Sequence, residues 1–151
     1  MRLLPSVLAA TLVATTAAAA PQVEAAWSRP AAQGTTGAGF LTLSNPKGPA
    51  DALIGIESPL SGHVMMHQTT MTAGGVSSMA MVSQVPVPAG GRVTFSPGGY
   101  HLMFMGLTKA LNVGDTLPAT LTFSSGAKVK AAFVVGLAPP VTPPPAAKPA
   151  H

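Results

Sequence analysis

Two stretches of the chain decide the fold: residues 92–106 read RVTFSPGGYHLMFMG, and residues 116–135 read TLPATLTFSSGAKVKAAFVV. In both, short runs of β-branched, aromatic and other apolar residues alternate with Ser, Pro and Gly, which favour turns. The same alternation extends towards the N-terminus as far as Gly39, with a turn expected at Pro86–Gly91. The expected strands are Gly39–Leu43, Ala52–Ile56, His63–Thr69, Val76–Val82, Arg92–Phe95, His101–Met105, Thr116–Phe123 and Lys128–Val135. Short strands at this spacing predict an all-β sandwich or barrel of about eight strands.

The two ends of the chain differ in composition from this middle part. Residues 1–20 combine a basic start, an apolar run and a series of small residues, which predict a cleaved export signal. The apolar run is too short for stable insertion into a membrane. Residues 137–151 are mainly Pro and Ala and predict a disordered tail. We therefore expect one folded domain over residues 21–136, which begins with an irregular lead-in at Pro21–Gly37.

The composition excludes several classes of protein. The chain has no cysteine, which excludes disulfides, thiolate nucleophiles and blue-copper sites with a Cys ligand. Removal of Arg2 with the signal lowers the net charge from +4 to +3, because seven basic and four acidic residues remain. These charges are scattered, so we expect no nucleic-acid partner. The four acidic residues and the serines form no recognisable catalytic motif, so we expect no enzyme.

Methionine and histidine are concentrated in one part of the chain. Apart from the initiator, all seven methionines lie from Met65 to Met105, and three of the four histidines lie from His63 to His101. Residues two apart in a strand share a face. The donors that share a face within one expected strand are His63, Met65 and His67; Met79 and Met81; and His101, Met103 and Met105. Three expected strands therefore each present thioether or imidazole groups at alternate positions.

These side chains predict a binding site for a soft metal ion. Thioether sulfur is a neutral, polarizable ligand that suits Cu(I) and offers little to Zn(II), Mg(II) or Ca(II). The predicted site for one Cu(I) ion consists of His67, Met79, His101 and Met103. Neutral ligands leave the ion its positive charge and favour exchangeable binding.

Other interpretations of the same residues remain open. Methionine is a common core residue, so we assign a packing or supporting role to Met65, Met66, Met71, Met81 and Met105. His63 and His151 are interpreted as surface residues. An alternative function is a metal-free exported β-sandwich module whose Met-rich face binds another protein. A copper buffer or tolerance protein is a further alternative.

The segment from His67 to Met103 resembles the periplasmic copper chaperones of the PCuAC type. Their motif is a His or Met, ten residues, a Met, twenty-one residues and then His-x-Met. Here twenty-one residues separate Met79 from His101, but eleven lie between His67 and Met79. A turn at Thr72–Gly75 can absorb the extra residue; if a strand absorbs it, His67 changes face and Met66 becomes the ligand. Further similarity covers Ala26–Pro30, Gly39–Asn45, Ala50-Asp51, Val87–Gly91, Pro97–Met103 and Leu111–Asp115.

This resemblance implies a cupredoxin-like Greek-key β-sandwich that carries Cu(I) in the periplasm. It further implies delivery towards the binuclear copper centre of cytochrome c oxidase. The implied partner is a copper-accepting protein, either the copper subunit of the oxidase or a Sco-like protein. We expect a monomer.

Overall fold

The computed structural model describes residues 20–140. Residues 1–19 of the predicted signal and residues 141–151 of the predicted tail lie outside the described residues. The strands within the described range are β1 (Gln22–Ser28), β2 (Gly37–Ser44), β3 (Asp51–Glu57), β4 (Ser61–Met71), β5 (Ser77–Met81), β6 (Val85–Val87), β7 (Arg92–Thr94), β8 (Tyr100–Leu107), β9 (Thr116–Phe123) and β10 (Lys128–Val135). Between residues 20 and 140, no helix has the length and apolar character needed to span a membrane.

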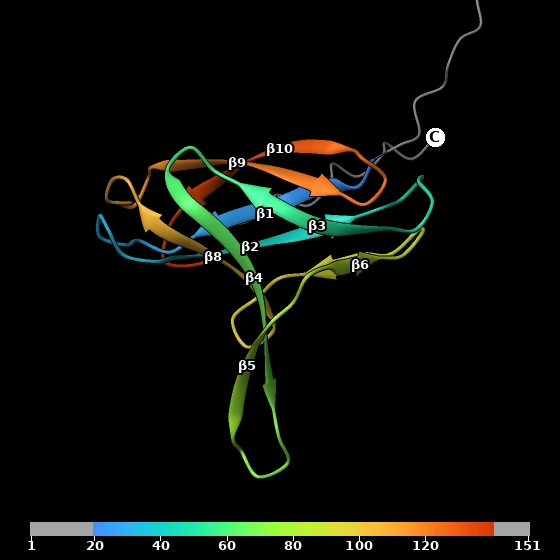
Figure 1. Ribbon diagram of the computed structural model, residues 1–151, viewed down its shortest axis with the longest axis horizontal. Helices are drawn as coiled ribbons and strands as arrows, with labels where there is room; N and C mark the ends of the chain where they lie inside the picture. Colours follow the sequence, from blue (N-terminus) through green and yellow to red (C-terminus); the bar gives the residue numbers. More distant parts are fainter. Residues whose placement is uncertain (1–19, 141–151) are drawn as a thin grey trace, which may run out of the picture.

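One curved sheet contains all ten strands, in the order β5-β4-β8-β2-β1-β10-β9-β3-β6, with β7 paired to β2. The pair β1–β10 is parallel, and the pairs on either side of it are antiparallel. The sheet folds over itself, so that β9 and β10 lie on the opposite side of the body from β2 and β8 (Figure 1). The core between them includes Leu41, Leu43, Leu53, Phe95, Leu102, Phe104, Leu117, Leu121, Phe123 and Phe133.

The first strand, β1, contradicts the sequence-based expectation of an irregular lead-in at Pro21–Gly37. Alanine and glutamate give this segment a low strand propensity. Nevertheless β1 pairs with β2 on one side and with β10 on the other, and Trp27 lies directly opposite Phe40. A β-bulge shifts the register between Glu24 and Trp27, where Ala25 has a φ of 48°. Pairing with two distant strands therefore outweighs local propensity.

The strand β6 is the second difference, and it brings the count to ten rather than about eight. A turn was expected at Pro86–Gly91, and proline has no backbone N–H to donate to a neighbouring strand. Pro86 instead lies between the fully buried Val85 and Val87. Proline is tolerated there because β6 stands at the end of the strand order, beside β3.

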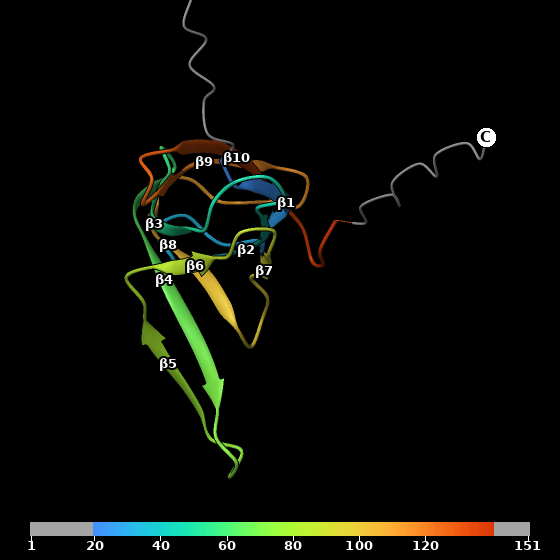
Figure 2. The ribbon, with the colours of Figure 1, turned by 90° about the vertical axis from the view of Figure 1, so that its right-hand side faces the viewer.

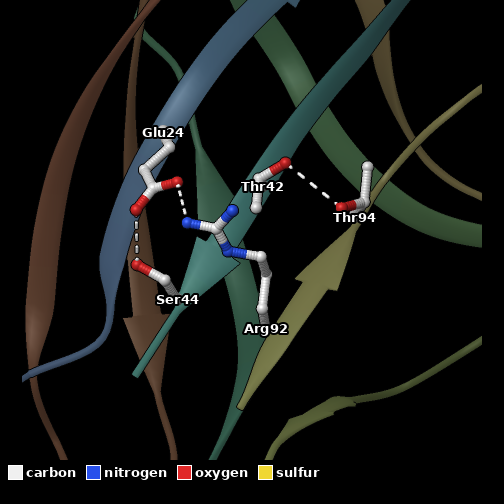
Figure 3. Close-up of polar contacts among 5 residues, drawn as sticks. All are labelled: Glu24, Thr42, Ser44, Arg92 and Thr94. Carbon is white, nitrogen blue, oxygen red and sulfur yellow. Dashed lines mark hydrogen bonds and ion pairs between the residues drawn. The ribbon is translucent and has the colours of Figure 1, made fainter. Parts of the chain in front are cut away.

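Polar contacts join β1, β2 and β7 at the surface (Figure 3). Arg92 Nη2 lies 2.7 Å from Glu24 Oε2, and the Ser44 hydroxyl donates to Glu24 Oε1 at 2.8 Å. The hydroxyl oxygens of Thr42 and Thr94 are 3.3 Å apart. The Arg92 and Glu24 side chains are 63% and 39% exposed, so their ion pair contributes at most about 1 kcal/mol. These contacts therefore mainly define the position of the short strand β7.

Phe104 fixes β8 against the core. Its side chain is fully buried, and its ring meets the Phe133 ring edge to face at a centroid distance of 5.5 Å. A Cβ atom at Gly39 would lie 2.5 Å from Phe104 Cε2, so glycine is needed where β2 approaches this ring. The packing of Phe104 thereby positions Met103 and Met105, its neighbours on β8.

The hairpin of β4 and β5 extends away from the body of the molecule (Figures 1 and 2). The first part of β4 pairs with β8, and its last five residues pair with β5. Residues 70–81 are all exposed. One long strand, β4, therefore runs from the packed body into this extension.

Candidate metal centre

His67 on β4 and His101 on β8 lie directly opposite each other in an antiparallel pair. Their ring centroids are 5.6 Å apart, with an interplanar angle of 65°. The neighbouring residues Met66 and Leu102 point into the core, with exposures of 7% and 0%. Since side chains alternate along a strand, the two imidazoles share the face that points away from the core.

The backbone prepares His101 to act as a ligand. Its side chain is buried, and its Nδ1 lies 3.3 Å from the carbonyl oxygen of Gly99. A carbonyl can only accept a hydrogen bond, so this contact places the ring proton on Nδ1. The Nε2 atom then carries the free lone pair of a neutral imidazole. A hydrogen bond of this kind orients the histidine ligands of metal sites.

His67 carries the most unusual feature of the site. Both of its ring nitrogens are buried and have no hydrogen-bond partner among the described residues. A buried polar atom without a partner costs about 1–3 kcal/mol. Nitrogen donors of this kind fit a metal ion, which would take the lone pair of one ring nitrogen.

Met103 lies on the same face as the two histidines. It is two residues from His101 and directly opposite Met65, and both methionines are half-buried. The structure therefore brings together three of the four predicted ligands: His67, His101 and Met103. That these residues bind a metal remains a prediction.

Met79, the fourth predicted ligand, does not lie directly opposite His67. The pairing of β4 with β5 places Met81, not Met79, opposite His67, and Met79 lies opposite Thr69. The amide of Val82 donates to the carbonyl of Met66 at 2.9 Å, so the adjacent His67–Met81 pair is of the type without hydrogen bonds. Side chains approach more closely in such pairs. Met81 is thus the methionine of β5 in the row of His67 and His101, and Met79 is one step nearer the hairpin end.

Eleven residues lie between His67 and Met79, one more than in the motif, and the strand register shows where the chain accommodates the extra residue. The β4–β5 pairing is continuous from His67–Met81 to Met71–Ser77, so the turn after Met71 absorbs the residue. Met66 is 7% exposed and belongs to the core. The alternative in which Met66 replaces His67 is therefore wrong.

Five methionines were expected to have a packing or supporting role, and packing into the core applies to only some of them. Met66 is a core residue. Met71 and Met81 are each 67% exposed, so neither packs into the core, and a supporting role for them stays a prediction. Sequence analysis assigned Met81 to this group because strand alternation indicates a face but not which residue lies opposite. Met79 and Met81 are two residues apart on β5 and therefore share a face, which already made Met81 a possible ligand from the sequence.

Aromatic residues lie on the same face beyond Met103. Met103 pairs with Ala38 of β2, and Phe40 is two residues further along that strand. The rings of Trp27 and Phe40 have a centroid distance of 4.8 Å, and both are buried. Within residues 20–140 no group of three His, Asp or Glu side chains is arranged to hold a metal ion. The additional donors beside the two imidazoles on this face are thioether sulfurs, which favour soft ions.

Comparison of the sequence finds relatives over most of the described domain. The model of the family described as "Putative lipoprotein LpqE-like" matches residues 21–135. The lipoprotein of similar description Lxx21020 from Leifsonia xyli subsp. xyli is 32% identical over 105 residues. This match covers 70% of the present chain, which spans only 63% of the length of that relative.

Solved structures with the same fold include copper-bound domains. The copper-bound PCuAC domain from PmoF2 matches with a TM-score of 0.64 and 26% identity, over 80% of this chain and 95% of that domain. CuI-DR1885 from Deinococcus radiodurans matches with a TM-score of 0.57 and 33% identity, over 75% of this chain and 77% of that protein. These matches confirm the resemblance to the PCuAC type and the cupredoxin-like β-sandwich.

Proposed function

Because this chain belongs to the LpqE-like family, we propose that it binds one Cu(I) ion on the His- and Met-bearing face of β4, β5 and β8 and acts as a copper chaperone. The observation that carries this proposal is the cross-strand pair of His67 and His101, in which both ring nitrogens of His67 are buried and find no hydrogen-bond partner within residues 20–140. The copper-bound PCuAC domain from PmoF2 and CuI-DR1885, which share the fold, support it. The proposal assigns no catalytic activity.

The proposed ligands are His67, His101, Met103 and one methionine of β5. The sequence motif favours Met79, whereas the cross-strand register favours Met81. All four groups are neutral when they bind, so the ion keeps its single positive charge. A set of imidazole and thioether donors without carboxylate suits Cu(I) over hard divalent cations.

The burial of the donors indicates how the ion would be released. His101 is buried, whereas Met79 and Met81 are 56% and 67% exposed on the extended hairpin. A ligand from an acceptor protein can approach the ion from the side of these methionines. Exchange would then begin at a weak thioether bond and end at the buried imidazoles. This order protects the ion until the acceptor holds it.

The location and the acceptor belong to the same proposal. The export signal expected at residues 1–20 and the lipoprotein description of the family support a position outside the cytoplasm. We place the mature protein in the periplasm, after cleavage of the signal. The proposed acceptor is the copper subunit of cytochrome c oxidase or a Sco-like protein.

Titration with Cu(I) against a competing chelator tests the binding. Trp27 is the sole tryptophan of the chain and lies on the face of the site, so its fluorescence reports loading. We expect one tightly held equivalent, with nitrogen and sulfur neighbours in X-ray absorption. Absence of binding would contradict the proposal and favour the metal-free interaction module.

Deletion of the gene separates delivery from storage. Loss of oxidase activity at low copper, restored by added copper, is the outcome expected for a delivery protein. Normal oxidase activity combined with copper sensitivity would instead indicate a buffer or tolerance protein.

Paired substitutions identify the methionine of β5. We expect Met81→Ala to weaken Cu(I) binding by about tenfold, in the range seen when groups around a metal site are lost. Met79→Ala serves as the matched variant, because it removes another exposed thioether two residues away on the same face of β5, and we expect a smaller loss. Both substitutions lie on the exposed hairpin, so neither should change the melting temperature of the apoprotein. A larger loss for Met79→Ala would show that the motif spacing outweighs the register.

A further inference from the structure

The row of donors on β4 and β8 continues beyond His67 and His101. Met65 lies opposite Met103, and His63 lies opposite Met105. The intervening Val64 and Phe104 point to the other face, where Phe104 is fully buried. With a rise of about 3.4 Å per residue, the His63–Met105 pair lies about 14 Å from the His67–His101 pair. One metal ion therefore cannot contact both pairs.

The His63–Met105 pair is held in place by neighbouring hydroxyl groups. The Ser61 hydroxyl lies 2.8 Å from the carbonyl oxygens of both His63 and Met105 and joins the two strands at this point. The Thr36 hydroxyl donates to Met105 Sδ at 3.5 Å. A thioether sulfur has a second lone pair, which stays available. These contacts fix the backbone and one sulfur much as outer groups fix the ligands of a metal site.

The packing interpretation does not account for these side chains. His63 is exposed, and Met65 and Met105 are half-buried on the face that points away from the core. The main core contains Met66 but neither Met65 nor Met105. Three soft or imidazole donors thus gather at the end of β4 that is opposite to the hairpin.

We propose that His63, Met65 and Met105 form a second site for a soft monovalent cation of the Cu(I) class. Two thioethers and one neutral imidazole supply a three-coordinate set, which lacks the charged oxygen donors that hard cations require. Met65 also faces Met103, so one ligand of the second site lies directly opposite one ligand of the first. The second site shares no proposed ligand with the first and does not depend on it.

Silver(I) is the probe for this site, because it is a soft monovalent ion that resists oxidation. The experiment uses the full chain with 13C-labelled methionine methyl groups, observed by NMR, and native mass spectrometry for the number of bound ions. The starting variant carries His67→Ala and His101→Ala, which remove both imidazoles of the first site. We expect this variant to bind one silver ion, which shifts the methyl signals of Met65 and Met105.

Adding His63→Ala and Met105→Leu to the starting variant should abolish this binding. Adding Met71→Leu is the matched control, because it removes an exposed methionine of the same strand and should leave the binding intact. The second site is contradicted if the starting variant leaves the Met65 and Met105 signals unchanged. It is also contradicted if loss of His63 and Met105 leaves the silver bound. Failure of the first site would appear separately, as equal silver binding by the natural chain and the starting variant.

Discussion

Replacing His101 with alanine is expected to weaken Cu(I) binding by more than about 100-fold, because loss of groups that merely support a ligand already costs 10–100-fold. His101 is the ligand that the backbone prepares most completely, through the 3.3 Å contact between Nδ1 and the Gly99 carbonyl. Its loss would leave His67 as the single imidazole of the first site. Competition with a Cu(I) chelator measures the change.

Tyr100→Phe is the control for this substitution. Tyr100 is the preceding residue of β8, and its ring contacts Phe95 of the core at a centroid distance of 5.5 Å. Loss of its hydroxyl should leave the affinity for Cu(I) unchanged. Circular dichroism of both apoproteins should report the same β-rich fold. If the His101 variant binds Cu(I) with an affinity within a few-fold of that of the natural protein, the proposed first site is wrong.

Replacing Phe104 with alanine is expected to lower the free energy of unfolding by about 3–5 kcal/mol, the usual cost of truncating a buried aromatic residue. The substitution removes the edge-to-face contact with Phe133 and opens a cavity beside Gly39. Domains of this size have total stabilities of about 5–15 kcal/mol, so the loss is a large fraction. Urea unfolding of the apoprotein measures it.

Val134→Ala is the matched control for the core substitution. Val134 neighbours Phe133 on β10, but its side chain is 47% exposed. We expect a loss below about 1 kcal/mol, as for most surface positions. Equal losses for the Phe104 and Val134 variants would contradict the assignment of Phe104 to the core. Because Phe104 also positions Met103 and Met105, its loss should weaken metal binding as well.

The strand alternation of the sequence predicts the faces of the site correctly. Leu102 and Phe104 enter the core, and His101, Met103 and Met105 face the other way. This prediction succeeds because the side-chain period of two is a local property of one strand. The position of the glycine-containing turn after Met71 was likewise readable, because glycine marks it.

The features that were not predicted depend on pairing between distant segments. Whether Met79 or Met81 faces His67 depends on the conformation of the β4–β5 turn, and a shift of register changes every cross-strand pair. The strand β1 pairs with β2 and β10, and this pairing outweighs the low strand propensity of its alanines and glutamate. Pro86 similarly takes part in β6 because two valines beside it reach the core. Local composition does not predict which distant segments pair with one another.

The short outermost strands have a consequence for how copies of this protein meet in solution. β5 has five residues, and β6 has three with a proline in the middle. Edge strands that are short or contain proline are poor templates for pairing with a strand of a neighbouring copy. A protein with only 8% charged residues has little electrostatic repulsion to keep copies apart. Backbone shape thus protects it against aggregation where charge is scarce.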